Sequence, residues 1–168
     1  MALGQKIDAR YVNAFVAGAV NAVQTKYGVE MQRGAAYVRN RKRSHPYDVS
    51  GSIKLGGQVT GVVTINFTRP VICSLVTKML GEPVTAINKT VCDTVGEMVR
   101  IMAESAKQHM EEANTHIKIS LPRIISGRFQ SHDYPVGVPC IVVPFKTPPG
   151  EFTIEVAVKA QQVVKTDD

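Results

Sequence analysis

The sequence predicts a single α+β domain in which a mostly antiparallel sheet of about six strands packs against long helices on one face. Two observations predict this class: one long, strongly amphipathic helical segment, and several segments in which apolar and polar residues alternate. Loops between consecutive strands are short, and short loops can join only antiparallel strands. The length of 168 residues fits one domain over 1–168, with a polar tail at 161–168.

The segment Asn88–Glu112 has the strongest helical periodicity in the chain. Asn88 suits the N-cap, because its side-chain oxygen can accept from the free N–H groups of the first turn. Eight apolar residues fall in one arc of roughly 140° on a helical wheel: Val91, Val95, Met98, Val99, Met102, Ala103, Ala106 and Met110. The opposite side carries Asp93, Glu97, Arg100, Glu104, Lys107 and Glu111. We therefore expect a buried face and a charged ridge on this helix.

Two further helices are predicted from periodicity and from their end residues. The segment Ile7–Tyr27 repeats apolar residues at helical spacing, and Gly28 is a natural stop. Pro70 can occupy the first turn of a second helix, which Gly81 ends.

Alternating and short apolar segments predict the strands. Tyr47–Phe67 indicates a hairpin that turns at Gly56-Gly57, because both halves alternate around a glycine pair. The other expected strands are a weak one within Val29–Val38, then Ile117–Pro122, Ile124–Phe129, a central strand over Cys140–Phe145, and Phe152–Val158.

Composition excludes several classes of protein. The hydrophobic fraction is 44%, and no run of about 18 apolar residues exists, so no membrane span is expected. The N-terminus lacks a charged region followed by an apolar one, which favours retention in the cytoplasm. The three cysteines, Cys73, Cys92 and Cys140, have no C-x-x-C spacing and are interpreted as buried free thiols.

Much of the formal charge of +6 lies in the run Arg39–Arg43. A nucleic-acid patch would use these charges for phosphate contacts. The alternative is a solvated loop that is poorly ordered and dispensable for the fold. The run is short and lacks interleaved aromatic residues, which favours the loop and argues against a nucleic-acid partner.

No familiar catalytic or cofactor-binding motif is present. The chain lacks G-x-x-x-x-G-K-[ST], G-x-G-x-x-G and G-x-S-x-G, and its histidines show no metal-ligand spacing: His45, His109, His116 and His132. Glu97, Arg100 and Glu104 of the charged ridge remain as the candidate site. The alternative is that these residues have no binding or catalytic role. Glu97, Arg100 and Glu104 would then only form salt bridges along the helix, worth about 0.2–0.5 kcal/mol each.

Short motifs extend over most of the chain in a fixed order. They are Asn13-Ala14-Phe15, Gly51-x-Ile53, Gly61-Val62-Val63, Met79-Leu80-Gly81-Glu82, Asp93-x-x-Gly96-Glu97, Ile119-Ser120-Leu121-Pro122, Val143-Pro144-Phe145-x-Thr147 and Gly150-x-Phe152. Together they resemble the CheX branch of the CheC/CheX/FliY family of chemotaxis phosphatases.

The resemblance implies an activity and a partner. Members of this family remove the phosphoryl group from the aspartate of a phosphorylated CheY-type receiver domain. They carry D-x-x-G-E-x-x-N on the long helix, where the Glu bonds to a receiver lysine and the Asn amide orients the attacking water. The magnesium ion belongs to the receiver, so no cofactor is expected in this chain. The resemblance also implies a homodimer that pairs through strands.

The long helix departs from the family pattern after Glu97. Glu97 matches the family Glu, but Arg100 stands at the family Asn position, and Glu104 and Ser105 stand where the family has small residues. A guanidinium offers five donors and no acceptor, so it cannot accept a proton from water, although it pairs well with a phosphoryl oxygen.

Two functions follow from the resemblance. In the first, the chain acts on a phosphorylated receiver, with catalysis weakened or lost. The candidate catalytic residues are then Glu97 and Arg100, and the candidate partner-binding residues are Asp93, Glu97, Arg100 and Glu104. In the second, the chain is a non-catalytic protein-interaction module of the same fold.

Overall fold

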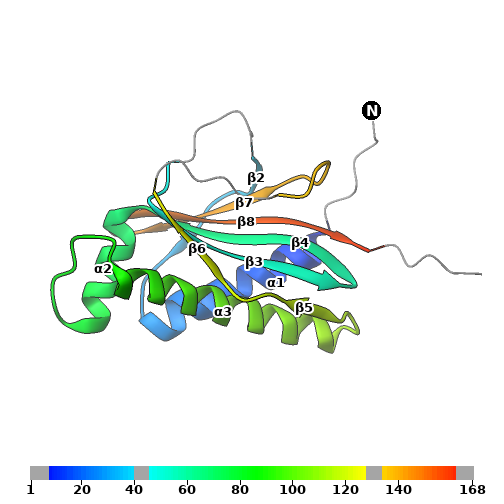
Figure 1. The fold of residues 1–168 in the computed structure, drawn as a ribbon, viewed down its shortest axis with the longest axis horizontal. Helices are drawn as coiled ribbons and strands as arrows, with labels where there is room; N and C mark the ends of the chain where they lie inside the picture. Colours follow the sequence, from blue (N-terminus) through cyan, green and yellow to red (C-terminus); the bar gives the residue numbers. More distant parts are fainter. Residues whose placement is uncertain (1–7, 40–45, 128–133, 162–168) are drawn as a thin grey trace, which may run out of the picture.

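The computed structural model describes residues 8–39, 46–127 and 134–161. One antiparallel sheet forms a layer, and the long helices lie along one of its faces (Figure 1). A shorter helix lies at one end of the sheet. The predicted α+β class and the placement of the long helices are thus confirmed.

The helices begin and end near the predicted residues. They are α1 Ala9–Val20, a π-helical segment η1 Asn21–Thr25, α2 Arg69–Leu80 and α3 Lys89–Glu112. Asn88 caps α3, since its Oδ1 accepts from the Val91 N–H at 2.9 Å. Gly81 ends α2 in the left-handed conformation at φ 73°, which glycine adopts without steric cost.

The sheet contains eight strands in six positions. In chain order they are β1 Gln32–Arg33, β2 Tyr37–Val38, β3 Val49–Gly57, β4 Val59–Phe67, β5 Ile117–Ile119, β6 Arg123–Ser126, β7 Ile141–Thr147 and β8 Gly150–Ala160. The order across the sheet is β1-β7-β8-β4-β3-β5, with β2 also paired to β7 and β6 also paired to β3.

The expected count of about six strands is therefore too low by two. Each edge position is divided between two short strands, because β1 and β2 both pair with β7, and β5 and β6 both pair with β3. The predicted strand Cys140–Phe145 is β7, and it has partners on both sides, as expected of an inner strand. The predicted strand Ile124–Phe129 is β6, but Phe129 lies outside the described residues.

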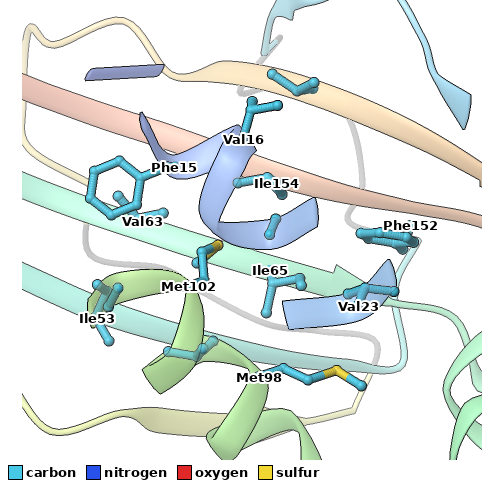
Figure 2. Close-up of a cluster of buried hydrophobic side chains, with 14 of the residues drawn as sticks. Phe15, Val16, Val23, Ile53, Val63, Ile65, Met98, Met102, Phe152 and Ile154 are labelled. Carbon is cyan, nitrogen blue, oxygen red and sulfur yellow. The ribbon is translucent and has the colours of Figure 1, made fainter. Parts of the chain in front are cut away.

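The main core lies between the helices and the sheet. All eight apolar residues predicted for the inner face of α3 are buried. Figure 2 shows side chains of α1, α3 and the central strands meeting there, including Phe15, Met102 and Ile65. The three cysteines are free; Cys73 and Cys140 are buried, and Cys92 is half-buried. No helix of the described ranges is long and apolar enough to cross a membrane.

α1 and α3 pack antiparallel at close range. A Cβ added at Gly18 of α1 would lie 2.4 Å from the backbone oxygen of Met102 in α3. Eight residues beyond Gly18, the chain reaches Lys26, which contacts Glu97, five residues before Met102. The absence of a side chain at Gly18 thus lets the two helices approach and sets which residues face each other beyond the crossing.

The sheet face away from the helices buries polar side chains. Ser50, Asn66 and Thr153 lie on β3, β4 and β8 and are fully buried. Ser50 Oγ donates to Asn66 Oδ1 at 2.5 Å, and Asn66 Nδ2 donates to Thr153 Oγ1 at 3.2 Å. Because each group finds a partner on the neighbouring strand, this row avoids the cost of buried unpaired polar atoms.

A buried carboxylate lies beside this row. Glu155 of β8 is 3% exposed; Arg39 Nη1 approaches its Oε2 at 3.2 Å, and the Tyr134 hydroxyl also donates to it. Burial raises the pKa of Glu155, and the bond from Tyr134 and the charge of Arg39 oppose that rise. Burial also raises the pKa of Tyr134. The side chain of Arg39 is itself only 18% exposed.

The prediction for the basic run is therefore wrong at its first residue. Arg39 is not a solvated loop side chain, because it compensates a buried carboxylate 116 positions away in the sequence. Sequence reasoning grouped it with the following charges, since nothing local distinguishes it. Residues 40–45 lie outside the described residues, so the expectation for Arg41, Lys42 and Arg43 stays a prediction.

We predict that Gly18→Ala lowers the free energy of unfolding by about 1–3 kcal/mol, because the new methyl group would overlap a backbone oxygen that cannot turn away. Helix propensity alone predicts the opposite sign. Gly96→Ala in α3 is the matched control, since its Cβ would lie 3.5 Å from Ile124 Cδ1, an ordinary contact. Urea unfolding should show a loss only for Gly18→Ala, and equal stability of the two variants would contradict this account of the crossing.

We predict that Arg39→Ser destabilises the protein by about 1–3 kcal/mol, because it leaves the buried Glu155 carboxylate without its cation. The comparison is a variant in which Arg41, Lys42 and Arg43 are all replaced with serine, for which the sequence predicts little change. Thermal unfolding at neutral pH measures both. A larger loss in the triple variant than in Arg39→Ser would contradict the structural role of Arg39.

Candidate functional site

Four charged residues of α3 form the candidate site, which we call the α3 ridge: Asp93, Glu97, Arg100 and Glu104. Steps of about 100° per residue place all four within an arc of roughly 60°, opposite the apolar face. The side chains of Glu97, Arg100 and Glu104 are 43%, 53% and 62% exposed. Every sequence-predicted site residue therefore lies on one solvent-accessible strip.

The backbone beneath the α3 ridge is held by close packing. Val95 and Val99, on the inner side of α3, lie against Gly51 of β3, where an added Cβ would be 2.9 Å and 2.7 Å from their methyl groups. Gly96 lies beside Ile124 of β6. Because α3 is fixed by α1 and by the sheet, the ridge presents its side chains from a rigid element.

Glu97 forms an ion pair with another helical segment. Lys26 Nζ donates to Glu97 Oε1 at 2.5 Å, and 71 positions separate the two residues in the sequence. Lys26 directly follows η1, the π-helical segment that extends α1. The hydrogen bond from Lys26 is the largest effect that holds the pKa of Glu97 below its usual value, and the charge of Arg100 acts in the same direction. Glu97 is therefore a carboxylate with a cation already bound.

Sequence reasoning missed Lys26. The sequence did contain a signal. The apolar stripe that runs along α1 and η1 includes Ala19 and Val23, and its spacing of three or four residues continues to Lys26. A lysine at the end of a buried stripe has its stem directed along the packed surface and its ammonium group at the rim. Finding its partner required knowing that α1 packs antiparallel on α3.

Arg100 is bound within its own helix. Its Nη1 donates to both carboxylate oxygens of Glu104 at 3.2 Å each. An exposed pair at i and i+4 contributes about 0.2–0.5 kcal/mol, and the order with the cation first is the less favourable one. Of the salt bridges expected along the helix, Arg100–Glu104 therefore forms, whereas Glu97 pairs with Lys26 instead of Arg100.

The α3 ridge offers two kinds of contact to a partner. Glu97 and Glu104 can bind a cation, and the guanidinium of Arg100 can bind an anionic oxygen through two donors. In the described part of the chain, no group of three or more His, Cys, Asp and Glu side chains could hold a metal ion. The buried group around Glu155 differs from the ridge, because its charges are compensated inside the protein.

A family model described as chemotaxis phosphatase CheX matches residues 49–146, which include α3 and the whole ridge. The match spans more than half of the chain. The protein belongs to the CheX family. A comparison with curated protein sequences found no match.

Solved structures show the same fold. A CheC-like superfamily protein from Shewanella sp. PV-4 is 25% identical and superposes with a TM-score of 0.82, covering 92% of this chain and 100% of that chain. The chemotaxis protein CheX from Vibrio vulnificus is 26% identical, with a TM-score of 0.81 and coverages of 89% and 99%.

A third structure was solved with a partner present. It is the CheX–CheY–BeF3–Mg²⁺ complex from Borrelia burgdorferi, in which the matching chain is 20% identical, with a TM-score of 0.76 and coverages of 92% and 99%. At this identity the likeness shows the fold alone. The α3 ridge thus lies on the long helix of a CheX-family fold.

Proposed function

We propose that this protein acts on the phosphorylated receiver domain of a CheY-type response regulator and docks through the α3 ridge, with catalysis weakened or lost. The observation that carries the proposal is the combination of an exposed Glu97 with a guanidinium at Arg100 on the long helix of a CheX-family fold. A cytoplasmic location is part of the proposal, since receiver domains are its targets.

In the proposed complex Glu97 binds the receiver lysine, and Arg100 lies near the phosphoryl group. Hydrolysis requires a water that attacks phosphorus while the aspartate carboxylate leaves. Such a water needs an acceptor to orient it, and a guanidinium has none. Arg100 can instead pair with phosphoryl oxygens, which supports binding without positioning the water. The magnesium ion in this complex belongs to the receiver.

Glu104 adds a second obstacle to hydrolysis. Arg100 and Glu104 are paired in the structure, so replacing the arginine alone leaves an unpaired carboxylate one turn from the phosphoryl group. Two negative groups at that distance repel each other. Full recovery of activity should therefore need substitutions at both Arg100 and Glu104.

The second candidate is a non-catalytic interaction module that binds a receiver or another protein. The lack of an acceptor at Arg100 favours it over a fast phosphatase. The two candidates share the docking surface and differ only in whether the bound phosphoryl group is released.

We predict that the wild type accelerates decay of a receiver's phosphoryl-aspartate weakly or not at all. Arg100→Asn should raise the rate, and Arg100→Asn combined with Glu104→Ala should raise it further, because the second change removes the unpaired carboxylate. A preorganised polar group contributes on the order of 10²–10³ in rate, which is the upper limit of the gain. Stopped-flow or radiolabel assays of phosphoryl-aspartate decay measure these rates.

Glu97→Ala is the control in the wild-type and Arg100→Asn backgrounds, and it should weaken receiver binding in both. A fast wild type that Arg100→Asn slows would show that arginine is the working residue. If no variant binds any phosphorylated receiver, then the fold is shared with the family and the partner is not.

We further propose a homodimer that pairs through the outer edge of β2. Tyr37 and Val38 are 51% and 59% exposed on this edge strand. Exposed apolar side chains beside a sheet edge can be covered by a second chain. Light scattering should give twice the chain mass of 18.3 kDa. Val38→Lys should lower that mass, whereas Leu121→Lys beyond the opposite edge should not; a monomeric wild type would contradict the proposal.

A further inference from the structure

Glu97, the residue proposed to bind a receiver lysine, already binds a lysine of its own chain. The ammonium group of Lys26 lies 2.5 Å from Glu97 Oε1, and the side chains of Lys26 and Glu97 are 46% and 43% exposed. The pair is therefore accessible to an incoming partner and lies on the proposed docking strip. Any cation that binds Glu97 in the same way must displace Lys26.

The backbone of Lys26 is held by the fold, and its position does not depend on the ion pair. Ala22 and Val23 of η1 are fully buried. Gly28 N donates to Gln24 O at 2.9 Å, and Lys78 Nζ of α2 donates to Gly28 O at 3.0 Å. The backbone on both sides of Lys26 is thus tied to the protein. A π-helical turn carries an additional residue per turn, and such turns occur often at functional sites.

We propose that Lys26 occupies Glu97 in the free protein and competes with the cation of the docking partner. The proposal rests on the proposed function, because it takes a CheY-type receiver as the partner. In this arrangement the hydrogen bond from Lys26 favours the ionised form of Glu97 and holds its carboxylate in place on α3. A receiver lysine that reaches the carboxylate can then replace Lys26.

The ion pair between Lys26 and Glu97 is weak enough for another cation to replace Lys26. Exposed ion pairs are weak, because solvent screens the charges and two long side chains lose rotamer freedom. Lys26 can therefore leave Glu97 at small cost, and its release lowers partner affinity only a few-fold. A receiver lysine that is desolvated at the interface meets Glu97 in a lower effective dielectric, where the same pair of charges attracts more strongly.

The first experiment tests the pair itself. Lys26→Met keeps most of the apolar stem and removes the charge, so the pKa of Glu97 should rise toward the value of an exposed glutamate. Carboxyl-detected NMR titration of isotopically labelled protein measures this pKa. Lys107→Met is the matched control, because Lys107 also lies near a glutamate of α3, with Nζ 3.9 Å from Glu111 Oε1, and its removal should leave Glu97 unchanged.

The second experiment tests the competition. A CheY-type receiver activated with BeF3⁻ and Mg²⁺ is titrated into wild type, Lys26→Met and Lys107→Met in an isothermal titration calorimeter. Lys26→Met should bind the receiver roughly 2- to 5-fold more tightly, the range expected for an exposed ion pair. Lys107→Met removes the same charge from the protein and should not tighten binding. Lys26→Arg should bind like the wild type.

Three results would overturn the inference. An unchanged Glu97 pKa in Lys26→Met would show that the pair does not form in solution. Unchanged or weaker receiver binding by Lys26→Met would show that Lys26 does not compete, while the proposed function stands because the receiver still binds. Absence of receiver binding by all variants, including the wild type, would overturn the proposed function together with this inference.

Discussion

The burial of the apolar face of α3 against both α1 and the sheet is the constraint on which the rest of the structure depends. Its eight apolar residues have almost no exposed surface. Fully burying one valine or methionine side chain contributes about 1.5–3 kcal/mol before entropy is counted. The close approach at Gly18 and at Gly51 leaves α3 no room to rotate. A helix held this firmly on one side must present its other side in a fixed orientation.

The fold treats its charges in two ways. On the sheet face away from the helices, Glu155 is buried and compensated by Arg39 and Tyr134, so that group stabilises the structure and is not available to a partner. Along α3, Glu97, Arg100 and Glu104 are half exposed and held only by weak ion pairs. Weak pairs cost little to break, so they keep charged side chains ordered without withholding them from an interface.

Membership of the CheX family and the exposed charges of the α3 ridge together support the proposed docking of a receiver domain. The family scaffold is present, and Arg100, three residues after Glu97, can bind an anion but cannot accept a hydrogen bond from water. Under the proposed function, the protein holds a phosphorylated partner but releases its phosphoryl group slowly or not at all. Lys26 adds a further factor, because its ammonium group is bound to Glu97, the carboxylate proposed to dock the receiver.

The sequence by itself determined the α+β class, the bounds of α2 and α3, the buried face of α3 and the four residues of the α3 ridge. These features depend on local signals: helical spacing, the Asn88 cap and the Gly81 end. Only the tertiary structure decided that each sheet edge is divided between two strands, that Arg39 serves Glu155, and that Lys26 binds Glu97. The two ion pairs join residues 71 and 116 positions apart in the sequence. These features depend on how helices and strands pack. The periodicity of the sequence shows which face of an element is apolar, but it does not show which other element that face will contact.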